Sequence, residues 1–163
     1  MFTSRPERLK AFDYLGPHRY FLTFCTDRRH QAFVDRAPVE LVHTQILRTS
    51  TLTAFAITAY CYMPDHLHLL VEGLENRSDC REFISKAKQY SGFYYARLTS
   101  RRLWQRYSYE RTLRDEEATE GVVRYILENP IRAGMVQSPE EYPFSGSSRY
   151  TISEMSDAVQ WAA

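Results

Sequence analysis

The chain has 163 residues, of which 44% are hydrophobic and 14% aromatic, and its formal net charge is +1. This length and composition predict one globular domain over residues 1–163, with a core over about 16–150 and a tail over 151–163, and they argue against a disordered chain. The three cysteines form no Cys-x-x-Cys pair and no segment has the roughly 18 consecutive apolar residues of a spanning helix, so we expect a cytoplasmic protein without disulfide framework, structural zinc or membrane contact.

The first half of the chain predicts a strand, a helix and a strand pair. Residues 20–26 are aromatic and β-branched, which favours a strand. A helix is expected over 38–49, because Pro38 suits a first helical position and apolar residues then recur every three or four positions. Two further apolar runs, 55–63 and 66–72, are separated by Pro-Asp and predict a β-hairpin.

The second half predicts a helix, a strand and another helix. The amphipathic segment 78–98 begins with the capping residues Ser and Asp and is rich in basic residues. Residues 107–113 alternate well enough for a fourth strand. A helix is expected over 115–129, since acidic residues suit its start and the residue before Pro130 avoids the helical region. The last thirty residues are rich in Ser, Pro and acidic residues, and we expect them to wrap the surface and to fray at the extreme end.

These elements follow the order strand, helix, strand, strand, helix, strand and helix. Strands linked by a tight hairpin pair antiparallel, and helices between strands must pack on the sheet to bury their apolar sides. The sequence therefore predicts the α+β class, with a ferredoxin-like antiparallel sheet and helices packed on one face. An exposed edge strand of such a sheet would allow two chains to pair as a homodimer.

The small net charge conceals two segments of opposite sign. Residues 77–114 contain ten Lys or Arg and three Asp or Glu, whereas residues 115–163 contain three basic and nine acidic residues. A basic segment is what contact with a nucleic-acid backbone requires, although a charged surface often faces only solvent.

Two histidines stand one residue apart in the strand expected over 66–72. Side chains at positions i and i+2 of a strand project from the same face, so we expect the imidazoles of His66 and His68 to lie side by side. Neutral ring nitrogens in this arrangement can ligate a metal ion, while a buried pair without partners would leave polar atoms unsatisfied. The alternative is structural, with one histidine at the strand end and the other bonded to a backbone carbonyl.

A second pair lies in the helix expected over 115–129. Tyr125 and Asn129 are four residues apart, which places them on one face of that helix. A phenol can act as a nucleophile when a cation or base assists it, and an amide oxygen is a ligand for Mg²⁺ or Mn²⁺. The alternative is that Tyr125 packs beside Val122 and Ile126 while Asn129 only ends the helix.

Taken together, the motifs resemble those of the REP-associated tyrosine transposases, a group of single-stranded DNA endonucleases with a His-hydrophobic-His signature. The resemblance extends from about residue 16 to residue 150. The matching segments are 62–70 (Tyr-Met-Pro-Asp-His-Leu-His-Leu-Leu), 103–106 (Leu-Trp-Gln-Arg), 114–117 (Arg-Asp-Glu-Glu), 125–136 (Tyr-Ile-Leu-Glu-Asn-Pro-Ile-Arg-Ala-Gly-Met-Val) and 142–147 (Tyr-Pro-Phe-Ser-Gly-Ser).

The resemblance implies a metal-dependent enzyme that cleaves and rejoins single-stranded DNA. His66, His68 and Asn129 would hold a divalent cation, Mg²⁺ or Mn²⁺, and Tyr125 would attack the scissile phosphate to form a 5′-phosphotyrosine. It further implies that the target is a hairpin-forming repetitive extragenic palindrome. The basic segment would then follow the DNA backbone, and its candidate residues are Lys86, Lys88, Arg101, Arg102, Arg106, Arg111 and Arg114.

The chain departs from the family pattern in the strand before the tyrosine helix. Relatives often have a histidine after an acidic residue there, whereas Glu110 is followed here by Arg111. An arginine can contact a phosphate but does not titrate near neutral pH, so the departure bears on activity more than on the fold.

Other functions fit parts of the pattern. A nucleic-acid-binding module on a ferredoxin-like sheet would use strand aromatics such as Tyr20, Phe21 and Phe24 without catalysis. A metal-dependent phosphohydrolase that activates water would not need Tyr125, and a histidine-triad hydrolase would require a third alternate histidine where Leu70 stands. A domesticated transposase relative, with an intact site and a host role, is the remaining alternative.

Overall fold

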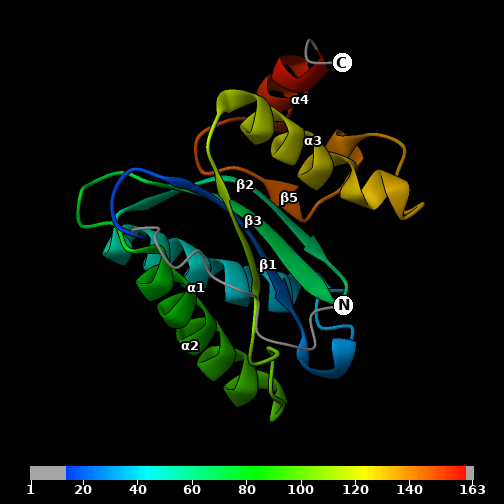
Figure 1. Ribbon diagram of the computed structural model, residues 1–163. Helices are drawn as coiled ribbons and strands as arrows, with labels where there is room; N and C mark the ends of the chain where they lie inside the picture. The colour runs from blue at the N-terminus through cyan, green and yellow to red at the C-terminus, as the bar shows by residue number, and fades with distance from the viewer. Residues whose placement is uncertain (1–13, 161–163) are drawn as a thin grey trace.

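The computed structural model describes residues 14–160, and its elements follow the predicted order (Figure 1). The core elements are β1 (Arg19–Cys25), α1 (Arg36–Thr53), β2 (Phe55–Met63), β3 (His66–Gly73), α2 (Cys80–Thr99), β4 (Tyr109–Leu113) and α3 (Glu116–Arg132). Shorter elements complete the fold: the 3-10 turns η1 (Asp27–Arg29) and η2 (Pro139–Glu141), the strand β5 (Ser145–Gly146) and the helix α4 (Ile152–Gln160).

The strands form one sheet in the order β4-β1-β3-β2-β5, and every pair of neighbours is antiparallel. The predicted α+β class with a ferredoxin-like antiparallel sheet is thus confirmed. Helices α1 and α2 pack on one face, as expected, and the structure adds a second layer, because α3 and α4 lie on the opposite face (Figure 1).

The central strands are apolar on both sides, which explains the three layers. In β1, Tyr20, Leu22 and Phe24 pack in the core under α1 and α2, whereas Phe21 packs with Leu70 in the core under α3. Successive side chains of a strand point to opposite faces, so a strand covered on both faces has a continuous apolar run instead of an alternating one.

The bounds of two helices differ from the prediction, and α1, expected to end at residue 49, continues to Thr53, where Ala54 caps it in the left-handed conformation. The helix α1 begins at Arg36, two residues early, with Asp35 at its N-cap. Pro38 is tolerated in the first turn because the N–H groups there have no partner within the helix. The helix α3 does not end at Asn129 but continues through Pro130 to Arg132.

The expected tail contains a helix instead of only irregular surface chain. Met155 and Val159 of α4 are buried with residues of α3 in the second core. The expected fraying at the extreme end concerns residues 161–163, which lie outside the described residues. Within residues 14–160, no helix combines the length and apolar character that crossing a bilayer needs.

Candidate active site

The two histidines begin β3, beside the end of β1. In the antiparallel register His68 is opposite Thr23 and His66 is opposite Cys25. Residues opposite each other project from the same face of a sheet, and Leu70 on the same side of β3 packs under α3. The ring centroids of His66 and His68 lie 4.7 Å apart, so the imidazoles are side by side on the α3 face.

Each imidazole uses Nδ1 for a side-chain hydrogen bond. Nδ1 of His66 lies 2.7 Å from Oδ1 of Asp65, and Nδ1 of His68 lies 2.9 Å from Oγ1 of Thr23. An ionised carboxylate only accepts hydrogen bonds, so the proton of neutral His66 is on Nδ1 and its Nε2 carries a lone pair. Nε2 of His68 is buried and has no hydrogen-bond partner in the described part of the chain.

Burial keeps both imidazoles neutral. It lowers the pKa of His68 to about 3, and the neighbouring His66, Arg132 and Arg29 lower it in the same direction. Burial also lowers the pKa of His66, although the Asp65 carboxylate opposes this shift. Neutral imidazoles with Nδ1 held by an oxygen are the form in which histidine ligates metal ions.

Tyr125 extends from α3 toward the same histidines. Its ring centroid lies 5.4 Å from that of His68 and 5.8 Å from that of Phe21. The residue is 45% exposed, whereas Val122 and Ile126 beside it are buried. The structural alternative for Tyr125, packing in the core with these neighbours, is therefore not what the fold shows.

Arg132, one turn beyond Asn129 at the end of α3, also contacts Tyr125. Its guanidinium carbon lies 4.3 Å from the centroid of the Tyr125 ring, and Nη2 donates to the Tyr125 carbonyl oxygen over 2.7 Å. These contacts, both within α3, place the Arg132 guanidinium over the ring of Tyr125.

A cleft of about 370 Å³ joins the histidines and the tyrosine. It is lined by Phe21, Thr23, Cys25, Arg29, His66, His68, Tyr109 and Tyr125. Asn129 is half-buried and does not belong to this lining. Within residues 14–160, no group of three His, Cys, Asp or Glu side chains is arranged to hold a metal ion. The histidine pair supplies two ligands of these residue types, and a third ligand would have to be of another type.

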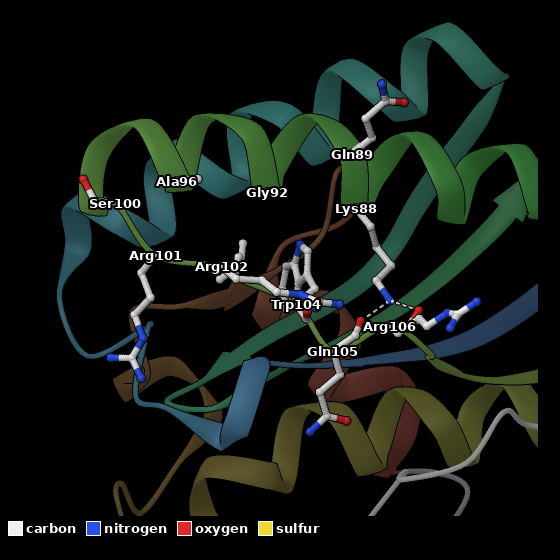
Figure 2. A pocket seen from close by; sticks show the side chains of 11 residues that line it. Lys88, Gln89, Gly92, Ala96, Ser100, Arg101, Arg102, Trp104, Gln105 and Arg106 are labelled. Atoms are coloured by element: carbon white, nitrogen blue, oxygen red, sulfur yellow. Dashed lines mark hydrogen bonds between the residues drawn. The ribbon is translucent and has the colours of Figure 1, made fainter.

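A larger and more open cleft of about 770 Å³ lies between α2 and residues 100–106. Figure 2 shows Lys88 reaching from α2 to the chain at Gln105 and Arg106. Its Nζ donates to the carbonyl oxygens of Gln105 (2.7 Å) and Arg106 (3.1 Å) and to Oγ of Ser108 (3.0 Å). Burial lowers the pKa of Lys88 to about 8. All three of its N–H groups are thus used to hold the loop.

The other basic candidates are more accessible. Arg101, Arg102 and Arg106 are exposed around this second cleft, and Arg111 and Arg114 are exposed at β4. Half-buried Lys86 pairs with Glu82 of its own helix over 2.7 Å.

The loop over residues 100–106, which carries Arg101, Arg102 and Arg106, is hydrogen-bonded to the end of β1, which lines the cleft at the histidines. The Gln105 N–H donates to the carbonyl of Cys25 over 2.9 Å, and the Asp27 N–H donates to that of Leu103 over 2.7 Å. Gln105 lines the second cleft and Cys25 lines the first, so this hydrogen bond connects the linings of the two clefts.

Sequence reasoning missed several residues around the histidines: Thr23, Cys25, Arg29, Asp65 and Tyr109. A contact between Asp65 and His66 could have been predicted, because Asp65 directly precedes His66 in the predicted turn. The others depend on the register of β1 against β3 and β4, which no local pattern of residues encodes.

The sequence matches the family model described as IS200-like transposase over residues 16–129. A Haemophilus influenzae protein assigned to the REP-associated tyrosine transposases is 26% identical over 88% of this chain and 87% of its own length. The REP-associated tyrosine transposase of Escherichia coli is 23% identical over 77% of this chain and 73% of its own length.

Among solved structures, a REP-associated tyrosine transposase bound to a REP hairpin superposes with a TM-score of 0.70 and 22% identity, over 88% of this chain and 82% of the other. At this identity the likeness shows the fold. The predicted resemblance to the REP-associated tyrosine transposases is confirmed by these comparisons.

Proposed function

The chain belongs to the IS200-like transposase family, a family of DNA-cleaving and strand-transferring enzymes, and from this membership we propose that it cuts and rejoins single-stranded DNA through a 5′-phosphotyrosine at Tyr125. The observation that carries the proposal is the convergence of an exposed phenol and two neutral imidazoles in one cleft. The proposed substrate is the hairpin of a repetitive extragenic palindrome, because a relative of the same fold is described as bound to such a hairpin.

A divalent cation, Mg²⁺ or Mn²⁺, is the proposed cofactor. The donors fit it, because Nε2 of His68 is buried with no hydrogen-bond partner among residues 14–160, and Nε2 of His66 carries a lone pair. Asn129, one helical turn after Tyr125, is the proposed third ligand. When bound, the cation would polarise the scissile phosphate and stabilise the charge on the departing oxygen.

The side chains around the histidines hold them in one orientation. Thr23 and Asp65 each bond an Nδ1 atom, which fixes the plane of each ring, and the Asp65 carboxylate, which only accepts, also fixes the tautomer of neutral His66. Phe21 packs edge-on against Tyr125 and limits where the phenol can move. Orientation of this kind lowers the entropic cost of bringing the nucleophile to the phosphorus.

The proposed reaction is a transesterification at phosphorus. The Tyr125 oxygen forms a bond to phosphorus while the bond to the 3′-oxygen breaks, which leaves a free 3′-hydroxyl. One phosphate ester replaces another, so a 3′-hydroxyl can attack the phosphotyrosine and rejoin DNA without ATP. Cleavage and strand transfer would thus use the same site.

A single strand is the proposed form of the DNA at the cleft. An unpaired backbone can bend to present its phosphate in line with the phenol without first melting a duplex. The exposed Arg101, Arg102 and Arg106 lie on the loop that is bonded to the end of β1, and they are the proposed contacts to the backbone. Lys88 supports this loop from within.

The decisive experiment is incubation of the protein with labelled hairpin DNA and Mn²⁺, followed by a denaturing gel. The wild type should form a slower, covalent band, and Tyr125→Phe should lose that band while still binding DNA, because only one hydroxyl is removed. Tyr109→Phe, a change of the same kind in the same cleft, is the matched control. Cleavage without a covalent band, unaffected by Tyr125→Phe, would favour a phosphohydrolase, and binding without cleavage would favour a binding module or a domesticated relative.

A further inference from the structure

Arg29 lies in the active cleft although no sequence motif points to it. It belongs to η1, immediately after β1, and lines the same cleft as His66, His68 and Tyr125. Among the eight lining residues it is the only arginine or lysine, and a guanidinium stays charged at neutral pH. A phosphodiester that enters this cleft therefore meets a fixed cation.

The guanidinium of Arg29 is held in place by Asp65 and Cys25, which lie beside the proposed metal ligands. Nε of Arg29 donates to Oδ2 of Asp65 over 3.0 Å, while the other oxygen of that carboxylate accepts from His66. Nη1 of Arg29 also donates to Sγ of Cys25 over 3.4 Å. These bonds use two of the five N–H donors of the guanidinium, which leaves donors for a ligand in the cleft.

The backbone that carries Arg29 has an uncommon conformation. Arg28 and Arg29 have φ values of 52° and 54°, in the left-handed region that favours glycine. The turn is maintained by hydrogen bonds from the N–H groups of Asp27 to Leu103, Arg29 to Thr26 and His30 to Asp27. Non-glycine residues persist in this conformation where the surroundings enforce it, and such positions cluster at ligand sites.

We propose that Arg29 contacts a non-bridging oxygen of the scissile phosphate while Tyr125 attacks, an inference that rests on the proposed function. In this step the bond from the Tyr125 oxygen to phosphorus forms and the bond to the 3′-oxygen breaks. The phenolic proton leaves to solvent through the open cleft, and the departing oxygen takes up a proton. Arg29 forms no covalent bond; its charge and paired donors hold the phosphate and offset the charge on its oxygens.

The first test compares Arg29→Gln with Arg28→Gln. Both variants remove one arginine from the same left-handed turn, but Arg28 is exposed and does not line the cleft. Loss of one donor to a reacting oxygen lowers cleavage rates by about 10²-fold or more, so Arg29→Gln should slow formation of the covalent band to that extent. Arg28→Gln should stay near the wild-type rate. Equal rates for wild type and Arg29→Gln would overturn the inference.

The second test separates a phosphate contact from an indirect effect through Asp65. The scissile phosphate is replaced by a methylphosphonate, in which a methyl group takes the place of one charged oxygen, and the two diastereomers are tested separately. With one of them, the roughly 10²-fold gap between wild type and Arg29→Gln should close. An unchanged gap with both diastereomers would mean that Arg29 acts only by positioning Asp65 and His66, and would overturn the proposal.

The comparison remains valid if Arg29→Gln is partly misfolded. The ratio of the rates on the two substrates, measured within one preparation, does not depend on the fraction of active protein. If the wild type forms no covalent band on the ordinary hairpin, the proposed function fails. If it does and the ratio is the same for wild type and variant, only the role of Arg29 fails.

Discussion

Replacing Thr23 and His68 together by apolar residues of similar size should stabilise the metal-free protein while abolishing DNA cleavage. Both residues are 5% exposed, and they bond each other through Oγ1 and Nδ1 over 2.9 Å. Nε2 of His68 is buried and has no hydrogen-bond partner within the part of the chain that the structure describes. In the double variant Thr23→Val/His68→Leu, neither the bonded pair nor the orphan nitrogen is left.

The expected gain follows from the cost of the orphan atom. A buried polar atom without a partner costs about 1–3 kcal/mol, whereas a neutral hydrogen bond contributes about 1 kcal/mol. We therefore expect the free energy of unfolding of the double variant to exceed that of the wild type by up to about 2 kcal/mol. The single variant His68→Leu leaves the Thr23 hydroxyl without its partner, so it should be less stable than the double variant by a similar amount.

Urea denaturation in the presence of a chelator measures these differences. Addition of Mn²⁺ should then raise the free energy of unfolding of the wild type, because the cation binds the folded state, and should leave the double variant unchanged. A double variant that is less stable than the wild type in chelator would refute the reasoning. It would mean that Nε2 of His68 is satisfied in the folded protein, and the main structural reason for a metal there would disappear.

Three further predictions concern other parts of the molecule. Burial lowers the pKa of His43 to about 4, against an ordinary value of about 6.5, so protonation favours the unfolded chain. The associated stability, about 3 kcal/mol, should be present above pH ~6.5 and be lost as the pH falls toward 4, and urea curves of His43→Gln should lack this component. Asn129→Ala should raise the Mn²⁺ concentration for half-maximal cleavage by about tenfold or more; an unchanged value would remove Asn129 from the ligand set. Changing Arg101 and Arg102 to Gln should weaken binding of single-stranded DNA regardless of sequence and reduce the slope of log affinity against log salt by about 1–2, and an unaltered slope would place the DNA elsewhere.

The ferredoxin-like core could be predicted because each of its elements has a clear local pattern. The hairpin over β2 and β3 is marked by its Pro-Asp turn, and α2 by its apolar spacing and its Asp79 cap. The second helical layer was harder to foresee, since Phe21 and Leu70 belong to strands that are apolar on both faces, and such strands do not reveal how many layers cover them. The helix α4 escaped prediction because its few apolar residues lie among Ser and acidic residues.

The site was predictable only in part. The pairing of His66 with His68 follows from strand geometry, but their approach to Tyr125 joins a strand and a helix far apart in the sequence. That approach was expected from the family resemblance alone. The role of Arg29 depends on the register of β1 and on a left-handed turn, and arginine gives no local signal for either.

The proposed nucleophile and the histidines belong to elements that are held in the fold in different ways. His66 and His68 belong to the middle strand of the sheet, whose backbone is bonded to β1 on one side and to β2 on the other, so these rings move only if the sheet itself deforms. Tyr125 belongs to α3, which contacts the sheet through side-chain packing. If Tyr125 attacks a phosphate as proposed, we therefore expect adjustments of the distance between its oxygen and the phosphorus to come from movement of α3 and not of the histidines.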